Sequence, residues 1–372
     1  MPHGDEIALL LRAARPVLED DDVTALRDLV KRADATLDWG FVVDQAYRHN
    51  VLSLLGRNML RYRLHPGLAD GANFLYEEMF SNAYHANQVR NEAFARELVV
   101  ILGELAGRGI CPVVRKGAVL GQEVFGDVGV RRSYDIDLMA EPEEVAAVEE
   151  VMAALGYEQG NLAANRRSVK PRTRSQEVFW SMRVPKRQFH RPASERFVGA
   201  YIIDLALNQF FPGSGYDLPA AGLDGRSRPI RLFGAQARAF THEEMVIDLT
   251  THLFKEATSF YYMRLGKDLT LSKFLDVATY ARTQPVDWPA VYERASAYRV
   301  TDPVYFALYY TEVIYPGSVP PGVLELFQAP ETTFLREFGR VDRDVKTWQG
   351  DFIARLFDTR RAADLPPSRI PM

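Results

Sequence analysis

The feature that most constrains the fold of this chain is a short apolar strand that ends at a glycine, followed by a second strand that carries two aspartates. The first segment is residues 113–118 (VVRKGA) and the second is residues 134–139 (YDIDLM). Because side chains alternate along a strand, Asp135 and Asp137 point to the same face. Two carboxylates at this spacing repel each other unless a cation lies between them, and hard oxygen ligands suit Mg²⁺. The alternative is that both side chains face solvent on an edge strand.

Gly117 stands where the strand predicted over residues 111–115 turns into a helix predicted over residues 117–125. A glycine at such a turn lets the backbone approach a phosphate group. The N-terminus of the helix that follows also favours anions. The first segment therefore predicts a phosphate site next to the two aspartates.

Four short segments together resemble a known family. They are KGAVL at 116–120, FGD at 125–127, RRSYDIDL at 131–138 and LGY at 155–157. The pattern resembles bacterial nucleotidyltransferase-like proteins that are often found beside biosynthetic genes, within the DNA polymerase β superfamily. The resemblance implies an α+β fold with a nucleotidyltransferase-type mixed β-sheet lobe. It also implies an enzyme that moves a nucleoside monophosphate from an NTP, with ATP expected, to an acceptor.

Transfer of this kind with two Mg²⁺ ions needs three carboxylates. Asp135 and Asp137 supply two, and Asp204 within residues 200–207 (AYIIDLAL) is the candidate for the third. An aspartate among apolar strand residues is costly to bury unless it is paired or bound to a metal. Relatives commonly have Leu-His after this acidic residue, whereas Ala206 stands here, so a role for that histidine is in doubt. The alternative for Asp204 is a salt-bridged or edge-strand aspartate.

The resemblance also implies where the nucleotide phosphates bind. Lys116 and Gly117 are expected to contact them. The wider superfamily usually has Gly-Ser or Gly-Gly at this turn, and Ala118 here lacks the hydroxyl group. We expect Lys116, Arg132 and Ser133 to compensate by binding the β- and γ-phosphates. The alternative for Arg132 is a solvated turn.

Residues 166–196 carry ten Lys or Arg residues and two acidic residues, with aromatic residues between them. Such a segment can bind nucleic acid through phosphate contacts and stacking, or it can bind a triphosphate or an anionic acceptor. A solvated hairpin is the third alternative. The candidate acceptor or phosphate contacts are Arg172, Arg174, Lys186 and Arg187, together with Lys255 from the C-terminal part. Asp276 is a further polar residue expected near the cleft.

The chain divides into four predicted parts. They are an N-terminal helical region (1–97), the nucleotidyltransferase core (98–235), a C-terminal helical region (236–358) and a tail (359–372). Within the core, strands are predicted at 134–140, 177–184 and 197–207. The pattern Asp-Trp-x-x-Val-x-x-x-Ala at residues 38–46 recurs at 287–295. The recurrence indicates either similar helical motifs on the two sides of the core or a chance likeness of capped helices.

Composition excludes several classes of protein. The net charge of −4 argues against a wholly basic nucleic-acid binder, and 37 of the 45 basic residues are arginine, which weakens arguments from arginine clusters. The single cysteine, predicted to be buried, excludes an internal disulfide framework and a cysteine-rich metal site. The N-terminus lacks a signal-peptide pattern, and no apolar run reaches about 18 residues. A cytoplasmic protein without membrane contact is expected.

Three functions remain open from the sequence. The leading one is a Mg²⁺-dependent nucleotidyltransferase whose acceptor is a small molecule or a peptide in a biosynthetic or modification pathway. The second is a tRNA- or RNA-binding protein, or an RNA-modifying nucleotidyltransferase, that uses residues 166–196. The third is a nucleotidyltransferase-like binding protein without turnover, which the missing hydroxyl at Ala118 favours.

Overall fold

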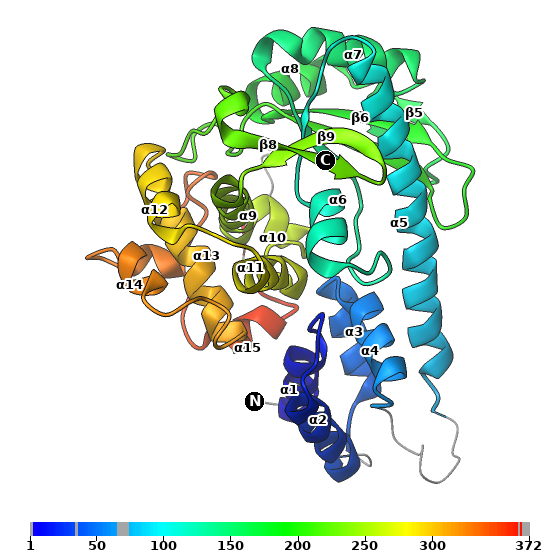
Figure 1. Ribbon diagram of the computed structural model, residues 1–372. Coiled ribbons are helices and arrows are strands. Elements are labelled where there is room, and N and C mark those ends of the chain that lie inside the picture. Colours follow the sequence, from blue (N-terminus) through cyan, green and yellow to red (C-terminus); the bar gives the residue numbers. More distant parts are fainter. Residues whose placement is uncertain (1–2, 34–35, 65–73, 364, 367–372) are drawn as a thin grey trace.

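The computed structural model describes residues 3–33, 36–64, 74–363 and 365–366. Figure 1 shows a twisted sheet at the top, with the N-terminal helices below it and the C-terminal helices beside them. One continuous hydrophobic core runs from the first helices through the sheet into the C-terminal helices. The fold is therefore of the predicted α+β class, with a mixed sheet and helical regions on both sides of it in the chain.

The N-terminal part is helical, as predicted. Its helices are α1 (Gly4–Ala13), α2 (Asp20–Ala33), α3 (Trp39–Arg48), α4 (Leu52–Arg61) and α5 (Glu77–Ala106). Helices α4 and α5 pack closely where Gly56 meets Phe80, because a Cβ on Gly56 would lie 2.4 Å from the Phe80 carbonyl oxygen. Helix α5 runs on from there to the sheet and continues unbroken through residues 97 and 98. The division of the chain at that point stays a prediction.

The central sheet has seven strands in the order β3-β6-β7-β2-β1-β9-β8. Their bounds are β1 (Val113–Val114), β2 (Ile136–Met139), β3 (Glu158–Gln159), β6 (Lys186–Pro192), β7 (Ala200–Ala206), β8 (Ser227–Leu232) and β9 (Ala235–Phe240). The pairs β2–β7 and β1–β9 are parallel and the others are antiparallel. The parallel β2–β7 pair brings the two aspartate-bearing segments of the sequence side by side.

Shorter elements connect these strands. They are α6 (Gly117–Leu120), a π-helical turn (Gly121–Phe125), a 3₁₀ turn (Pro142–Glu144), α7 (Val145–Ala154), the hairpin of β4 (Asn161–Leu162) and β5 (Val169–Lys170), α8 (Arg174–Arg183) and a 3₁₀ turn (Leu223–Arg226). The β4–β5 hairpin and α8 lie between β3 and β6 in the chain. They therefore form an insertion that contains most of the predicted basic segment.

The C-terminal part is mainly helical. It contains α9 (His242–Ala257), α10 (Phe260–Arg264), α11 (Leu271–Thr283), α12 (Trp288–Ala297), α13 (Thr301–Ile314), α14 (Val323–Phe327), a 3₁₀ turn (Thr333–Arg336), the pair β10 (Glu337–Phe338) and β11 (Lys346–Thr347), and α15 (Phe352–Phe357). The side chain of Thr241 accepts a hydrogen bond from the backbone N–H of Glu244 at the start of α9. Such a cap satisfies one of the free donors at a helix N-terminus.

Two local predictions are wrong. Residues 177–184 were expected to be a strand because they are rich in Val, Phe and Trp, but residues 174–183 form α8. Thr173 and Gln176 build a capping box at its start, and this local signal outweighs the β-propensity of the residues that follow. Cys111 was expected to be buried in a strand, but β1 begins at Val113 and the Cys111 side chain is exposed.

The recurring pattern at residues 38–46 and 287–295 has the same structure in both places. Asp38 caps α3 and Asp287 caps α12, each by accepting a hydrogen bond from the backbone N–H three residues on. Two residues beyond the end of each helix stands a residue with positive φ, Asn50 or Arg299. A buried valine, Val51 or Val300, then stands at the N-cap position of the next helix. Each copy is thus an Asp-capped helix followed closely by a second helix.

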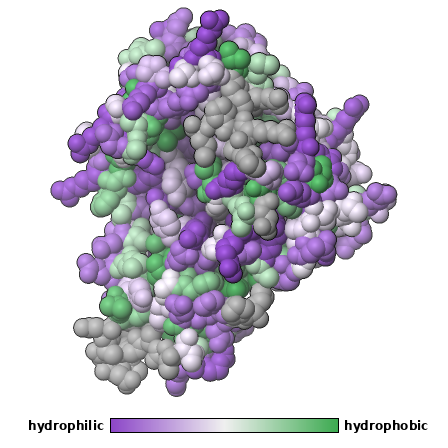
Figure 2. Space-filling view, turned by 180° about the vertical axis from the view of Figure 1, so that it is seen from behind, coloured by the Kyte–Doolittle hydropathy of each residue, from purple (hydrophilic) through white to green (hydrophobic). Residues whose placement is uncertain are grey.

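Among the described residues, no helix combines the length and the apolar character needed to cross a membrane. Figure 2 shows the face opposite to that of Figure 1, where hydrophilic residues are widespread and hydrophobic residues gather in small patches. The apolar side chains of the chain lie mainly in the continuous core instead.

Candidate active site

Three aspartates converge on neighbouring strands of the sheet. Asp137 in β2 is directly opposite Asp204 in the parallel strand β7. Asp135 immediately precedes β2, one strand step from Asp137. One carboxylate oxygen from each residue lies within 4.8 Å of the other two. The pleat of the sheet explains the arrangement. Asp135 and Asp137 are alternate residues and share one face, and Asp204 lies on the same face because it is paired with Asp137.

Helix α5 holds the loop that leads to these aspartates. The Asn91 amide donates hydrogen bonds of 2.7 Å to the carbonyl oxygens of Val128 and Arg131. One turn earlier, the Asn87 amide donates to the Gly129 carbonyl at 2.7 Å. These side chains satisfy loop carbonyl groups that no strand or helix pairs. The residues before Asp135 are therefore held by side chains of the 30-residue helix α5.

The aspartates have unequal electrostatic surroundings. Burial, followed by repulsion from Asp137 and Asp204, raises the pKa of Asp135 to about 7. Burial by itself would also raise the pKa of Asp137, but the charges of Lys116 and Arg115 outweigh it, so the pKa of Asp137 lies below its ordinary value. Gathering three carboxylates in one partly buried place is thus unfavourable for at least one of them, and a bound cation would relieve the repulsion.

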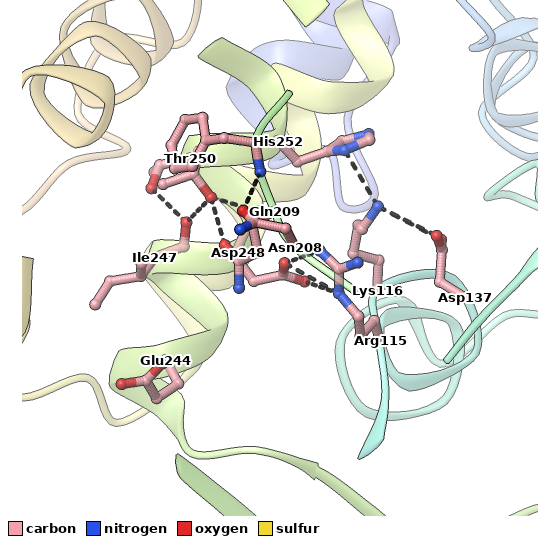
Figure 3. A network of polar contacts seen from close by, with 12 residues as sticks. Arg115, Lys116, Asp137, Asn208, Gln209, Glu244, Ile247, Asp248, Thr250 and His252 are labelled. Atoms are coloured by element: carbon pink, nitrogen blue, oxygen red, sulfur yellow. Dashed lines mark hydrogen bonds and ion pairs between the residues drawn. The ribbon is translucent and has the colours of Figure 1, made fainter. Parts of the chain in front are cut away.

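Lys116 stands at the turn between β1 and α6 in an uncommon backbone conformation, with φ of 39°. This region is unfavourable for residues with a Cβ, and such strain gathers at functional sites. In this conformation the Lys116 side chain contacts two polar residues, Asp137 and His252. The Lys116 ammonium lies 3.5 Å from the Asp137 carboxylate and 3.2 Å from Nδ1 of His252 (Figure 3).

His252 continues this network into helix α9. Burial, together with the charge of Lys116, lowers the pKa of His252 well below its ordinary value, so the ring is neutral. Since an ammonium group can only donate, Nδ1 accepts from Lys116, and the ring proton belongs on Nε2. Nε2 lies 3.3 Å from Oε1 of Glu256, whose other oxygen pairs with Lys273. A polar chain therefore connects the glycine turn to the C-terminal helices.

Gly117 lies against the residues that precede Asp135. A Cβ on Gly117 would lie 3.2 Å from the Ser133 hydroxyl oxygen and 3.4 Å from Nη1 of Arg131. The glycine thus allows Ser133 to approach the turn and places a hydroxyl group beside it, although Ala118 has none. Arg131 is held in turn by Asp276 of α11 through two hydrogen bonds of 2.8 and 2.7 Å.

A cleft of about 1240 Å³ opens over the three aspartates. Nine of the residues predicted from the sequence as site residues line it: Lys116, Gly117, Arg132, Ser133, Asp135, Asp137, Lys186, Asp204 and Lys255. Asp276 lines it as well. Residues more than 100 positions apart in the chain therefore meet around one cavity.

Three predicted residues lie elsewhere. Arg187 points to the opposite face of β6 from Lys186 and pairs with Glu149 of α7 at 3.1 Å. Arg174 is exposed at the start of α8. Arg172 stacks on Trp180 with its guanidinium carbon 4.0 Å from the ring centroid. None of the three is among the residues that line the cleft.

Lys255 occupies the α9 wall of the cleft. Burial, followed by repulsion from Lys116, lowers its pKa to about 7. Its ammonium lies 5.4 Å from the centre of the Phe211 ring. Among the described residues, no carboxylate forms an ion pair with it. An anionic ligand in the cleft would raise the pKa of Lys255 again and bind it as the ammonium ion.

A second group of cations surrounds Tyr134 at the cleft. The charged groups of Arg132, Arg90 and Lys267 lie 4.7, 5.2 and 5.9 Å from the centre of its ring. In the part of the chain that the structure describes, no ion pair joins these three residues to a carboxylate. Cations packed around an aromatic face without a counter-ion form a site that favours an anion.

The similarity of this chain to a known protein family agrees with this geometry. A protein-family model described as uncharacterised nucleotidyltransferase matches residues 35–316, which is well over half of the chain. The chain belongs to this nucleotidyltransferase family. No curated protein and no solved structure matches it. The matched residues contain the sheet, the three aspartates, the glycine turn and helices α9 and α11.

The structure of this nucleotidyltransferase family member also reveals polar contacts that the sequence did not predict. Arg115 and Asp248 form an ion pair that is almost completely buried, and its Nε–Oδ1 distance is 3.1 Å (Figure 3). Gln188 donates a hydrogen bond of 2.8 Å to Asp204. One signal was available for Asp248, which stands among apolar residues at 245–249 (MVIDL), because a buried charge requires a partner.

Proposed function

We propose that this protein is a Mg²⁺-dependent nucleotidyltransferase that moves a nucleoside monophosphate from an NTP, with ATP expected, to an acceptor. The observation that carries the proposal is the convergence of three carboxylates within 4.8 Å beside the glycine turn. Membership of the nucleotidyltransferase family supports the same reaction class.

The donor set fits a divalent cation. Asp135 and Asp137 would hold it, with Asp204 beside them, because Mg²⁺ prefers carboxylate oxygens together with substrate phosphates. The raised pKa of Asp135 supports this assignment, since burial and the neighbouring carboxylates oppose its ionisation when no cation is bound. When bound, the metal supplies positive charge that stabilises the phosphate oxygens during transfer.

The glycine turn would bind the triphosphate. Gly117 leaves room at the N-terminus of α6, and the Ser133 hydroxyl lies against it and takes the place of the one that Ala118 lacks. The Lys116 ammonium lies between this turn and Asp137, where it would neutralise phosphate charge. Arg132 would contact the β- or γ-phosphate from the cationic group around Tyr134.

For the acceptor we favour a small molecule or a peptide. The cleft is walled by aromatic and cationic residues, among them Trp180, Tyr261, Tyr262 and Lys255. The exposed basic residues of the β4–β5 hairpin and α8 favour the second candidate, an RNA acceptor, because phosphate contacts need accessible cations. The net charge of −4 favours the first.

The test is to incubate the full chain with each NTP labelled at the α-phosphate, Mg²⁺ and separate pools of small metabolites, peptides and RNA. We expect label in one pool with the wild type, none with Asp137→Asn and unchanged transfer with Asp21→Asn, an exposed aspartate in α2. Equal transfer by Asp137→Asn would refute the metal site. NTP binding without transfer to any pool would indicate a binding protein without turnover.

A further inference from the structure

The three aspartates of the site differ in the number of ion pairs and hydrogen bonds that their carboxylates make with other side chains. Both carboxylate oxygens of Asp204 are engaged: the Lys186 ammonium contacts Oδ2, and Gln188 donates a hydrogen bond of 2.8 Å to Oδ1. For Asp137, the one side-chain contact of this kind within the described parts of the chain is the longer one of 3.5 Å with Lys116. For Asp135, no side-chain donor lies within hydrogen-bond distance among the described residues. Asp204 is thus paired within the protein, whereas the other two remain available.

The position of Lys186 follows from the sheet. Strand β6 is antiparallel to β7, with Gln188 opposite Asp204 and Lys186 opposite Ala206. Because side chains alternate along a strand, Lys186 and Gln188 point to the same face as Asp204, and Arg187 points away. Regular strand pairing therefore carries an ammonium group to Asp204, and Lys186 also lines the cleft.

The Lys186 ammonium neutralises the negative charge that Asp204 could offer to a metal ion. Sites with two metal ions place them about 3.5–4 Å apart and share the carboxylates between them. The ammonium of Lys186 already supplies a positive charge at Asp204. A second divalent ion on Asp204 would lie next to that ammonium, and the two like charges would repel each other.

We propose that the protein holds one divalent cation, at Asp135 and Asp137, and that Lys186 takes the place of a second one at Asp204. This inference rests on the proposed nucleotidyl transfer. In that reaction the acceptor oxygen forms a bond to the α-phosphorus, and the bond from the α-phosphorus to the bridging oxygen breaks. Pyrophosphate leaves with the bonding electron pair, and the acceptor proton is released to solvent. Lys186 stabilises the negative charge that develops on the attacking oxygen.

The experiment counts bound ions instead of measuring turnover. The full chain is titrated with Mn²⁺ in the presence of α,β-methylene-ATP, which cannot be cleaved at the reacting bond, and protein-bound Mn²⁺ is followed by electron paramagnetic resonance. We expect one Mn²⁺ per nucleotide complex in the wild type and two in Lys186→Met, whose Asp204 is free to bind an ion. Two ions in the wild type, or one ion still in Lys186→Met, would overturn the inference.

Two matched variants test the placement of the charge. Lys186→Arg keeps the positive charge and should keep one ion. Arg187→Met removes the neighbouring cation on the opposite face, beside Glu149, and should also keep one ion. A second ion in Arg187→Met would mean that any loss of charge on β6 has the same effect, and the inference would fall.

A further variant tests the inference even if the Lys186→Met protein does not fold. Asp204→Asn should still bind one Mn²⁺ at Asp135 and Asp137, and Asp137→Asn should bind none. Loss of the ion in Asp204→Asn would show that Asp204 is a ligand and refute the inference alone. No Mn²⁺ in the wild type would refute the proposed metal-dependent function and this inference together, so the two failures are distinguishable.

Discussion

Arg115 and Asp248 form a buried ion pair that joins the residue before the strained Lys116 turn to the middle of helix α9. Nε of Arg115 lies 3.1 and 3.2 Å from the two carboxylate oxygens. The Arg115 backbone N–H also donates to the Asp137 carbonyl at 2.9 Å. The pair thus fixes the glycine turn relative to both β2 and the C-terminal helices.

Removing one partner of this pair should strongly destabilise the protein. We expect Asp248→Ala to lower the free energy of unfolding by about 3–5 kcal/mol, because it leaves a buried guanidinium without its counter-ion. The double variant Arg115→Met with Asp248→Leu should lose clearly less, since both charges are then gone. Urea unfolding followed by circular dichroism measures both. Equal stability of Asp248→Ala and the wild type would contradict the structural role of the pair.

Lys116→Ala should weaken NTP binding by roughly 10- to 100-fold, since a hydrogen bond to a charged group contributes about 1.5–3 kcal/mol. Isothermal titration calorimetry measures the change in affinity. The control is Lys31→Ala, which removes an exposed lysine in α2 and should leave affinity as it is. Unchanged affinity in Lys116→Ala would place the phosphates elsewhere in the cleft.

Asp135 should make the metal-free protein less stable as the pH rises. Its pKa is raised to about 7 in the folded chain, mainly by burial, from an ordinary value of 3.8. Between those values the folded state holds a proton that the unfolded state has released, so stability falls as the pH increases through that range.

The variant Asp135→Asn tests this directly. In the presence of a chelator at pH 8, we expect it to be more stable than the wild type by up to about 4 kcal/mol, since the shift from 3.8 to about 7 is roughly three pKa units and one unit corresponds to about 1.36 kcal/mol. The difference should shrink as the pH approaches 4. Thermal melts across the range measure it. A variant that is less stable than the wild type at pH 8 would show that Asp135 is well compensated without a metal.

The exposed basic residues of the insertion should not take part in NTP binding. We expect the pair Lys170→Glu with Arg174→Glu to change NTP affinity by less than about 1 kcal/mol, the usual scale for exposed charges. Both residues are exposed, and neither lines the cleft. The same experiment with RNA decides between the acceptors. Tight RNA binding that weakens steeply with salt, and further in the variant, would favour RNA over a small molecule or peptide.

Local patterns predicted much of this structure. The alternation of Asp135 and Asp137, the turn at Gly117 and the cap at Asp287 depend on residues within a few positions of one another. Strand β7 was predicted around Asp204 from its apolar, β-branched neighbours. Where two local signals conflicted the prediction was wrong, as for the strand predicted at residues 177–184, where the capping box at Thr173 outweighed β-propensity.

The sequence by itself determined which side chains share a strand face and where the chain turns, because backbone alternation and helix capping act over a few residues. Only the tertiary structure decided the partners of those side chains. Lys186 meets Asp204 because β6 pairs antiparallel with β7, and Arg187 leaves the cleft for the same reason. Arg115 finds Asp248 across 133 positions of sequence. Such contacts depend on how distant elements pack. A buried charge is unfavourable without a counter-charge, and only the packing of distant elements places that counter-charge beside it.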